Sequence, residues 1–325
     1  MMEMKKSLSK IREVLKNEGY IASTQILYTV CLAIETGMPI LIEGEPGVGK
    51  TSLAIALANG LKKELVRVQF YEGIDKNSIL YEYDYPKQLL MMNAIKDNIK
   101  QETEGLSPQD ALNVVSSSID FYSKNFIIER PLMKAINGED QKVLLLDEID
   151  KCSEETEYLL LELLSEYSIS IPELKEKITC PPEKRPIVIL TSNNYRELSD
   201  ALKRRCLYLY IEMPNKNEMA NIIYSKANVS QNFAKKIANE VSKIRGMELK
   251  QLPSISESIS WAQGLMSIVG EDVFVRQDRE ALINSLGILL KNHSDLVKVQ
   301  EKYLSASGLT DLENTDKKNS KKAGK

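Results

Sequence analysis

The sequence has few of the residues on which metal and disulfide sites depend. It contains one histidine and four cysteines among 325 residues, and the cysteines form no C-x-x-C pair. A structural zinc site or a disulfide framework needs such residues at short, fixed spacings. We therefore expect small, buried, unpaired thiols at Cys31, Cys152, Cys180 and Cys206.

Long apolar runs are also missing. The longest, at residues 143–146 and 187–190, have the length of a strand, whereas a helix that spans a bilayer needs about 20 apolar residues. Residues 1–16 mix lysine and glutamate with apolar residues at helical spacing, and they lack the apolar centre of a signal peptide. These features predict a cytoplasmic protein with no membrane segment.

The chain has no excess of positive charge. It carries 43 Lys and Arg against 46 Asp and Glu, a formal net charge of -3. Binding to a nucleic-acid backbone needs a clustered excess of cations, so we expect no nucleic-acid partner. A hydrophobic fraction of 43% is typical of a globular protein, and the length allows two domains.

Short apolar segments alternate with helical patterns in the first two thirds of the chain. This order predicts an α/β fold with a central parallel sheet flanked by helices, and all five strands are apolar enough to be central. The expected strands are residues 39–42, 65–70, 143–146, 187–190 and 207–213, and the expected helices are 51–61, 153–167 and 198–205.

Pro214 is expected to end the last strand, because proline cannot continue a central ladder. From Asn217 onward the pattern is helical only. We therefore predict a nucleotide-binding domain at residues 1–214, with an N-terminal helix and an insert near 71–130. A small helical lid domain follows at residues 215–312, and a disordered tail at residues 313–325.

The clearest motif is a phosphate-binding loop at residues 44–51, G-E-P-G-V-G-K-T, between a predicted strand and a predicted helix. Glycines let backbone N–H groups converge on phosphate oxygens, and the helix N-terminus adds partial positive charge. Lys50 can reach the β and γ phosphates, while the Thr51 hydroxyl is placed for Mg²⁺. The motif predicts ATP binding by Glu45, Pro46, Gly47, Val48, Gly49, Lys50, Thr51 and Ser52.

Two carboxylates, Asp147 and Glu148, follow the apolar segment at 143–146. Ligands bind at the carboxyl edge of open α/β sheets, where this segment would deliver them. Acidic residues after a strand can also simply cap a helix. Beside a phosphate-binding loop, we expect Asp147 to hold Mg²⁺ and Glu148 to polarise the attacking water.

Three further polar residues follow the next predicted strand. Asn193 could hydrogen-bond both the γ-phosphate and the water, although turn chemistry alone would also select asparagine there. Arg204 and Arg205 end the next predicted helix, where cations suit the helix dipole.

Together, residues 44–51, 146–148, 191–193 and 202–205 resemble the AAA+ ATPases. The runs at 69–73, 85–90, 147–151 and 191–207 resemble, more narrowly, the MoxR branch, and within it the members that accompany carbon monoxide dehydrogenase maturation. The resemblance covers residues 20–270.

This resemblance implies a ring ATPase, usually a hexamer, with the nucleotide between adjacent subunits. Asn193 takes the position that senses the γ-phosphate, and Tyr20 and Ile21 fall where the family packs the adenine base. Arg205, with Arg204 as its rival, matches the arginine finger that one subunit gives to the next, worth about 10³ to 10⁵ in rate. It also implies a hairpin at 168–178.

One residue departs from the family pattern. Many members have an arginine early in the last lid helix, where this chain has Ser256. A serine cannot offer positive charge to the γ-phosphate, so the coupling of lid motion to the nucleotide would need Arg276 or Arg279 to take over this role. The resemblance further implies a chaperone that remodels a protein client, with a von Willebrand A domain partner, in the maturation of a metalloenzyme.

Other functions share the same loop. A small-molecule kinase uses it too, but Glu148 suits activation of water better than transfer to a metabolite. The serine at position 256 also allows a nucleotide-gated binding module with little turnover. A DNA-remodelling ATPase is disfavoured by the missing basic surface.

Overall fold

The computed structural model describes residues 2–110, 123–276 and 278–303. Contacts divide the chain into two units. The first comprises the residues up to Glu18, Ala22–Glu43 and Thr51–Tyr210. The second comprises Gly19–Ile21, Gly44–Lys50 and the chain from Ile211 onward, so the phosphate-binding loop groups with the C-terminal helices. The predicted tail at 313–325 lies outside the described residues.

The first unit contains a five-stranded parallel sheet with the strand order β2-β5-β8-β1-β9. Its strands are β1 (Ile40–Glu43), β2 (Leu65–Gln69), β5 (Val143–Asp147), β8 (Ile187–Ser192) and β9 (Leu207–Tyr210). Every residue of β1, β5 and β8 is buried, as expected of parallel strands covered on both faces. The predicted α/β fold with a parallel central sheet is confirmed.

Two strands are not central, contrary to expectation. β2 and β9 form the edges of the sheet and alternate between exposed and covered residues. β9 also ends at Tyr210 and not at residue 213, so Pro214 does not terminate it. Valine and leucine occur in the edge strand β2 as well as in the central strand β5, so apolar character alone did not distinguish the two kinds of strand.

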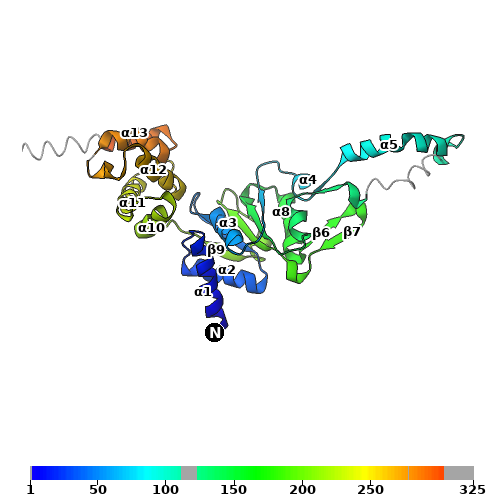
Figure 1. Cartoon of the computed structure of the whole chain (residues 1–325), viewed down its shortest axis with the longest axis horizontal. Helices are drawn as coiled ribbons and strands as arrows, with labels where there is room; N and C mark the ends of the chain where they lie inside the picture. The colour runs from blue at the N-terminus through cyan, green and yellow to red at the C-terminus, as the bar shows by residue number, and fades with distance from the viewer. Residues whose placement is uncertain (1, 111–122, 277, 304–325) are drawn as a thin grey trace, which may run out of the picture. The chain divides into compact units, whose positions relative to one another are not determined.

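Helices precede and connect the strands of this unit (Figure 1). They are α1 (Met2–Asn17), α2 (Thr24–Thr36), α3 (Lys50–Gly60), α4 (Lys76–Ile79), α5 (Tyr85–Thr103), α7 (Pro131–Ile136), α8 (Glu154–Glu166) and α9 (Asp200–Lys203). Ser153 and Ser199 cap α8 and α9 by accepting hydrogen bonds from backbone N–H groups three residues later. α9 is shorter than the predicted helix at 198–205 and ends immediately before Arg204.

Two hairpin-like pairings lie outside the main sheet. β3 (Tyr81–Tyr83) pairs antiparallel with β4 (Ile127–Glu129), within the region where we expect an insert. Residues 111–122 of that region are not described. β6 (Ser168–Ile171) and β7 (Glu176–Thr179) form an antiparallel hairpin at the position that the resemblance implies.

The second unit is helical from Lys216 on, within its described residues. Its helices are α10 (Lys216–Ala227), α11 (Gln231–Arg245), α12 (Ile255–Ile268) and α13 (Arg279–Leu289), yellow to orange in Figure 1, and helical turns also cover residues 293–303. Trp261 is fully buried in their core, and its indole N–H donates to Ser285 Oγ at 2.8 Å.

All four cysteines are free and buried, as expected. Among residues 2–110, 123–276 and 278–303, none of the helices combines the length and apolar character that crossing a bilayer demands.

Candidate nucleotide-binding site

The phosphate-binding loop joins the end of β1 to the first turn of α3. Gly47 and Gly49 have φ values of 78° and 98°, a region that glycine enters without steric cost. A Cβ on Gly47 would lie 2.3 Å from Ser254 Cβ, so no larger residue fits there. This backbone geometry is typical of loops whose N–H groups surround an anion.

Lys50 is buried at the base of this loop. Its Nζ donates to two carbonyl oxygens of the loop, Gly44 O at 2.7 Å and Glu45 O at 2.9 Å. These dipoles compensate for burying the ammonium group. Phosphate oxygens are stronger acceptors for a cation than carbonyl oxygens, so a triphosphate in the loop could take over these hydrogen bonds.

Asp147 ends β5 as a buried carboxylate with partners on both oxygens. Its Oδ1 accepts from Thr51 Oγ1 at 3.0 Å and from Thr191 Oγ1 at 2.6 Å. Its Oδ2 accepts from Arg67 Nη2 at 2.6 Å. The structure thus brings together the two predicted metal residues, Thr51 and Asp147. A hydroxyl and a carboxylate, completed by phosphate and water oxygens, fit Mg²⁺.

Glu148 and Asn193 also meet, because β5 and β8 are neighbouring parallel strands that end at the same edge of the sheet. Asn193 Nδ2 donates to Glu148 Oε1 at 3.4 Å, and Lys151 Nζ donates to Glu148 Oε2 at 2.6 Å. This bond to Glu148 raises the pKa of Lys151.

The backbone of Glu148 is unusual as well. It has φ 58° and ψ 47°, a left-handed conformation that costs a non-glycine residue about 1 kcal/mol or more. Its N–H donates to Thr191 Oγ1 at 2.9 Å, which helps to hold this geometry. Thr191 therefore fixes both members of the carboxylate pair.

Asp150 is a site residue that we did not predict. It is almost completely buried, and its Oδ2 accepts from the backbone N–H groups of Asn193 at 2.9 Å and Tyr195 at 2.8 Å. These bonds fix the turn that presents the Asn193 side chain. A third carboxylate so soon after Asp147 and Glu148 is the signal that could have indicated it.

Arg204 and Arg205 are both exposed beyond α9. Arg205 Nε donates to Ser165 Oγ at 2.5 Å and its Nη1 donates to Ala201 O at 2.9 Å, so its side chain is held in one orientation. Among the residues that the structure describes, neither arginine hydrogen-bonds to Thr51, Asp147, Glu148 or Asn193.

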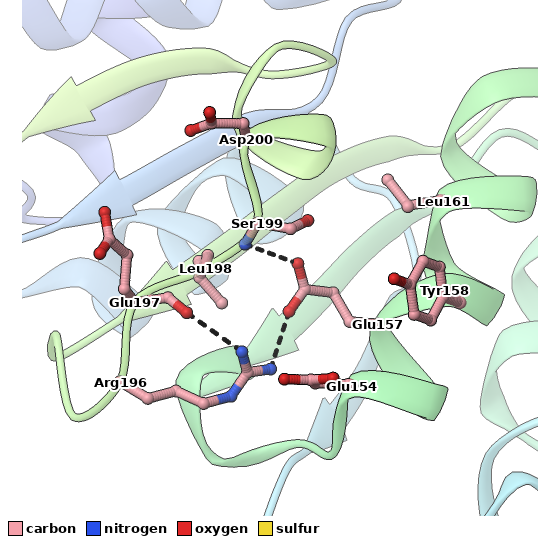
Figure 2. Close-up of a pocket in the computed structure, with 9 residues that line it drawn as sticks. All are labelled: Glu154, Glu157, Tyr158, Leu161, Arg196, Glu197, Leu198, Ser199 and Asp200. Atoms are coloured by element: carbon pink, nitrogen blue, oxygen red, sulfur yellow. Dashed lines mark hydrogen bonds and ion pairs between the residues drawn. The ribbon is translucent and has the colours of Figure 1, made fainter.

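A network around Glu157 of α8 fixes the segment between Asn193 and α9. Figure 2 shows its carboxylate between Arg196 and the backbone of Ser199. It accepts hydrogen bonds of 2.8 Å from both Arg196 Nη2 and Ser199 N. Burial would raise the pKa of Glu157, but these hydrogen bonds outweigh burial and lower it. The cavity beside it has a volume of about 480 Å³ and an acidic lining, with Glu154, Glu157, Glu197 and Asp200.

Tyr20 and Ile21 belong to the same unit as the loop. A Cβ on Gly49 would lie 3.7 Å from Tyr20 Cε2, so the Tyr20 ring lies close to the loop. Burial raises the pKa of Tyr20, whereas Ile21 is 45% exposed. Their packing against an adenine base stays a prediction.

An arginine that we did not predict contacts the loop. Arg245, at the end of α11, places Nη2 2.8 Å from Glu45 Oε2 and also donates to Pro253 O. Ser256 is exposed on α12, and Arg276 pairs with Asp272 of its own segment. A basic residue at the C-terminus of a helix normally interacts with the helix dipole. The sequence therefore offers no reason to expect that Arg245 contacts the phosphate-binding loop.

Comparison with known proteins decides the family. The model of the AAA domain (dynein-related subfamily) matches residues 39–206, which include the phosphate-binding loop, Asp147, Glu148, Asn193 and both arginines. The chain belongs to the AAA family. The resemblance to AAA+ ATPases is thereby confirmed, while the narrower likeness to the MoxR branch stays a prediction.

A more distant likeness extends beyond that segment. The chain is 25% identical over 213 residues to replication factor C subunit 3 of Arabidopsis thaliana, across 62% of this chain and 52% of that protein. The match thus spans about half the length of this relative.

Proposed function

We propose that this AAA protein hydrolyses ATP with Mg²⁺. The observation that carries the proposal is the meeting of Thr51, Asp147, Glu148 and Asn193 at the ends of two neighbouring strands and one helix. In a small-molecule kinase, the position of Glu148 would have to serve a metabolite hydroxyl. Here its neighbour is an asparagine able to orient water.

The residues divide the reaction between them. The loop amides and Lys50 bind the β and γ phosphates, and Thr51 and Asp147 would hold the Mg²⁺, which neutralises phosphate charge when bound. Glu148 accepts a proton from the water whose oxygen attacks the γ-phosphorus. As that bond forms, the bond to the β–γ bridging oxygen breaks and ADP leaves.

Completion of the site by a second copy is part of the proposal. Arg205 is exposed and held in one orientation, as a residue offered to a neighbour should be. We infer a homo-oligomeric ring, hexameric by family likeness, in which Arg205, or its rival Arg204, stabilises transition-state charge on the adjoining subunit. The helices after Ile211 act as the lid.

We also propose a protein client and a partner for this ATPase. By its likeness to the MoxR branch, the ring would remodel a protein client with a von Willebrand A domain protein, in the maturation of a metalloenzyme. Capture of such a partner that depends on ATP and on Lys50 would support this assignment, whereas equal capture by Lys50→Ala would contradict it.

The first test separates binding from turnover. Glu148→Gln should bind a fluorescent ATP analogue as tightly as wild type yet release phosphate about 10²-fold or more slowly, because the general base is lost. Turnover by wild type no faster than by Lys50→Ala would favour a gated binding module. Transfer of phosphate to a metabolite would favour a kinase.

A further inference from the structure

Arg67 makes an ion pair with the carboxylate that is expected to hold the metal. It lies on the edge strand β2, where the register places it beside Leu145 and places Gln69 beside Asp147. Its Nη2 lies 2.6 Å from Asp147 Oδ2 and 2.6 Å from Gln69 Oε1. The Arg67 side chain is 48% exposed, whereas that of Asp147 is 3% exposed.

This pairing matters because of what else surrounds Asp147. The partners of Oδ1, Thr51 and Thr191, are neutral hydroxyls. Thr51 can keep donating its proton to Asp147 while its lone pair faces a metal. The guanidinium of Arg67 cannot share Oδ2 in this way, because it repels a divalent cation approaching the same oxygen.

Stability does not explain the pair well. A half-exposed arginine contributes little to the stability of the fold through such a contact, since solvent screens the charge. The same exposure leaves the guanidinium free to turn toward solvent. Gln69 already accepts from the same nitrogen, so Arg67 has a second partner when it leaves Asp147.

We propose that Arg67 is a built-in competitor of Mg²⁺. It neutralises and positions Asp147 in the nucleotide-free protein and gives way when the metal and nucleotide bind, which raises the Mg²⁺ concentration that binding requires. Arg67 is thus a positioning residue that couples metal binding to a movement on the edge of the sheet. The inference rests on the proposed role of Asp147 in the metal site.

The test titrates Mg²⁺ against binding of a fluorescent non-hydrolysable ATP analogue, which needs no turnover. Arg67→Gln should lower the Mg²⁺ midpoint about fivefold, the effect of removing one nearby positive charge in a solvated site. Arg67→Lys, which keeps the charge, should stay within about twofold of wild type. Arg130→Gln removes an arginine of similar exposure paired with Glu82 and should leave the midpoint unchanged.

The outcomes are distinguishable. An unchanged or higher midpoint in Arg67→Gln, with a normal Mg²⁺ dependence in wild type, overturns the inference alone. If the wild-type protein binds the ATP analogue equally well with and without Mg²⁺, both the proposed metal site and this inference are overturned.

A second measurement uses the wild-type chain and does not depend on folding of a variant. Phenylglyoxal modifies accessible arginines, and mass spectrometry can follow Arg67 by itself. Its modification should become several-fold faster when Mg²⁺ and the ATP analogue are added together, with Arg130 as the internal reference. A rate that stays constant or falls contradicts release of Arg67 from Asp147.

Discussion

The phosphate-binding loop and the ends of β5 and β8 both carry charged side chains with internal partners, but those partners come from different units. In the loop, Lys50 donates to its own carbonyl oxygens and Glu45 pairs with Arg245 of α11. At the strand ends, Asp147 and Glu148 pair with Arg67 and Lys151 of the first unit. If Mg²⁺ and ATP bind as we propose, they meet two separate sets of contacts, one in each unit.

The largest effect should distinguish these two sets directly. Lys50→Ala should weaken nucleotide binding about 10- to 100-fold at any Mg²⁺ concentration, because a charged hydrogen bond to phosphate is lost. Asp147→Ala should retain weak binding but lose its dependence on Mg²⁺. Calorimetric titration with and without EDTA measures both effects. Identical behaviour of the two variants would contradict the division of the site into two separate sets of contacts.

A smaller effect is expected on the loop side alone. Arg245 is 14% exposed, and its loss leaves Glu45 and the Pro253 carbonyl without their partner. Arg245→Ala should destabilise the protein by about 1 to 2 kcal/mol and alter nucleotide affinity, with the Mg²⁺ midpoint unchanged. Chemical denaturation and the same binding titration test this. A shifted Mg²⁺ midpoint would show that the two sets of contacts are coupled.

The network around Glu157 should respond to pH. The pKa of Glu157 is lowered in the folded protein, so its carboxylate stabilises the fold above the ordinary glutamate pKa, near 4.5, and that contribution is lost as pH falls through the lowered value. Glu157→Gln should cost about 1 to 3 kcal/mol at pH 7 and progressively less in acid. Denaturant titrations at several pH values measure the difference in the free energy of unfolding between wild type and Glu157→Gln. A difference that grows as the pH falls would contradict the prediction.

The smallest effect concerns the thiols. Burial raises the pKa of all four cysteines, that of Cys206 to about 12, so the reactive thiolate is scarce at neutral pH. Folded protein should react with Ellman's reagent far more slowly than unfolded protein. The unfolded protein should release four equivalents of the coloured thiolate per chain, one for each cysteine. Rapid reaction of Cys206 in the folded state would show that the segment carrying Arg204 and Arg205 opens readily.

The sheet and much of the site were predictable because their signals are local. One signal is an apolar strand followed by Asp147 and Glu148, and another is the set of glycines before Lys50 and Thr51. Each indicates both the local backbone structure and the chemistry of the site within a few residues. Parallel strands end at one edge, so the meeting of Glu148 with Asn193 follows from the fold.

The contacts that the sequence did not reveal are those between distant segments. Arg67 and Asp147 are 80 residues apart and Arg245 and Glu45 are 200 apart, so spacing gives no sign that they meet. The edge position of β2 and β9 escaped prediction for the same reason, since strand order depends on the connections and not on the apolar character of each strand.

The most direct test of the central claim mixes two inactive variants. Arg205→Ala retains the binding site and Glu148 but offers no guanidinium, whereas Glu148→Gln offers the guanidinium but has no base. In a random one-to-one ring, about a quarter of the interfaces join an intact site to an intact arginine, so phosphate release should recover to about a quarter of the wild-type rate. Arg205→Ala as active as wild type, or a mixture no more active than its components, would contradict catalysis completed by a neighbouring copy.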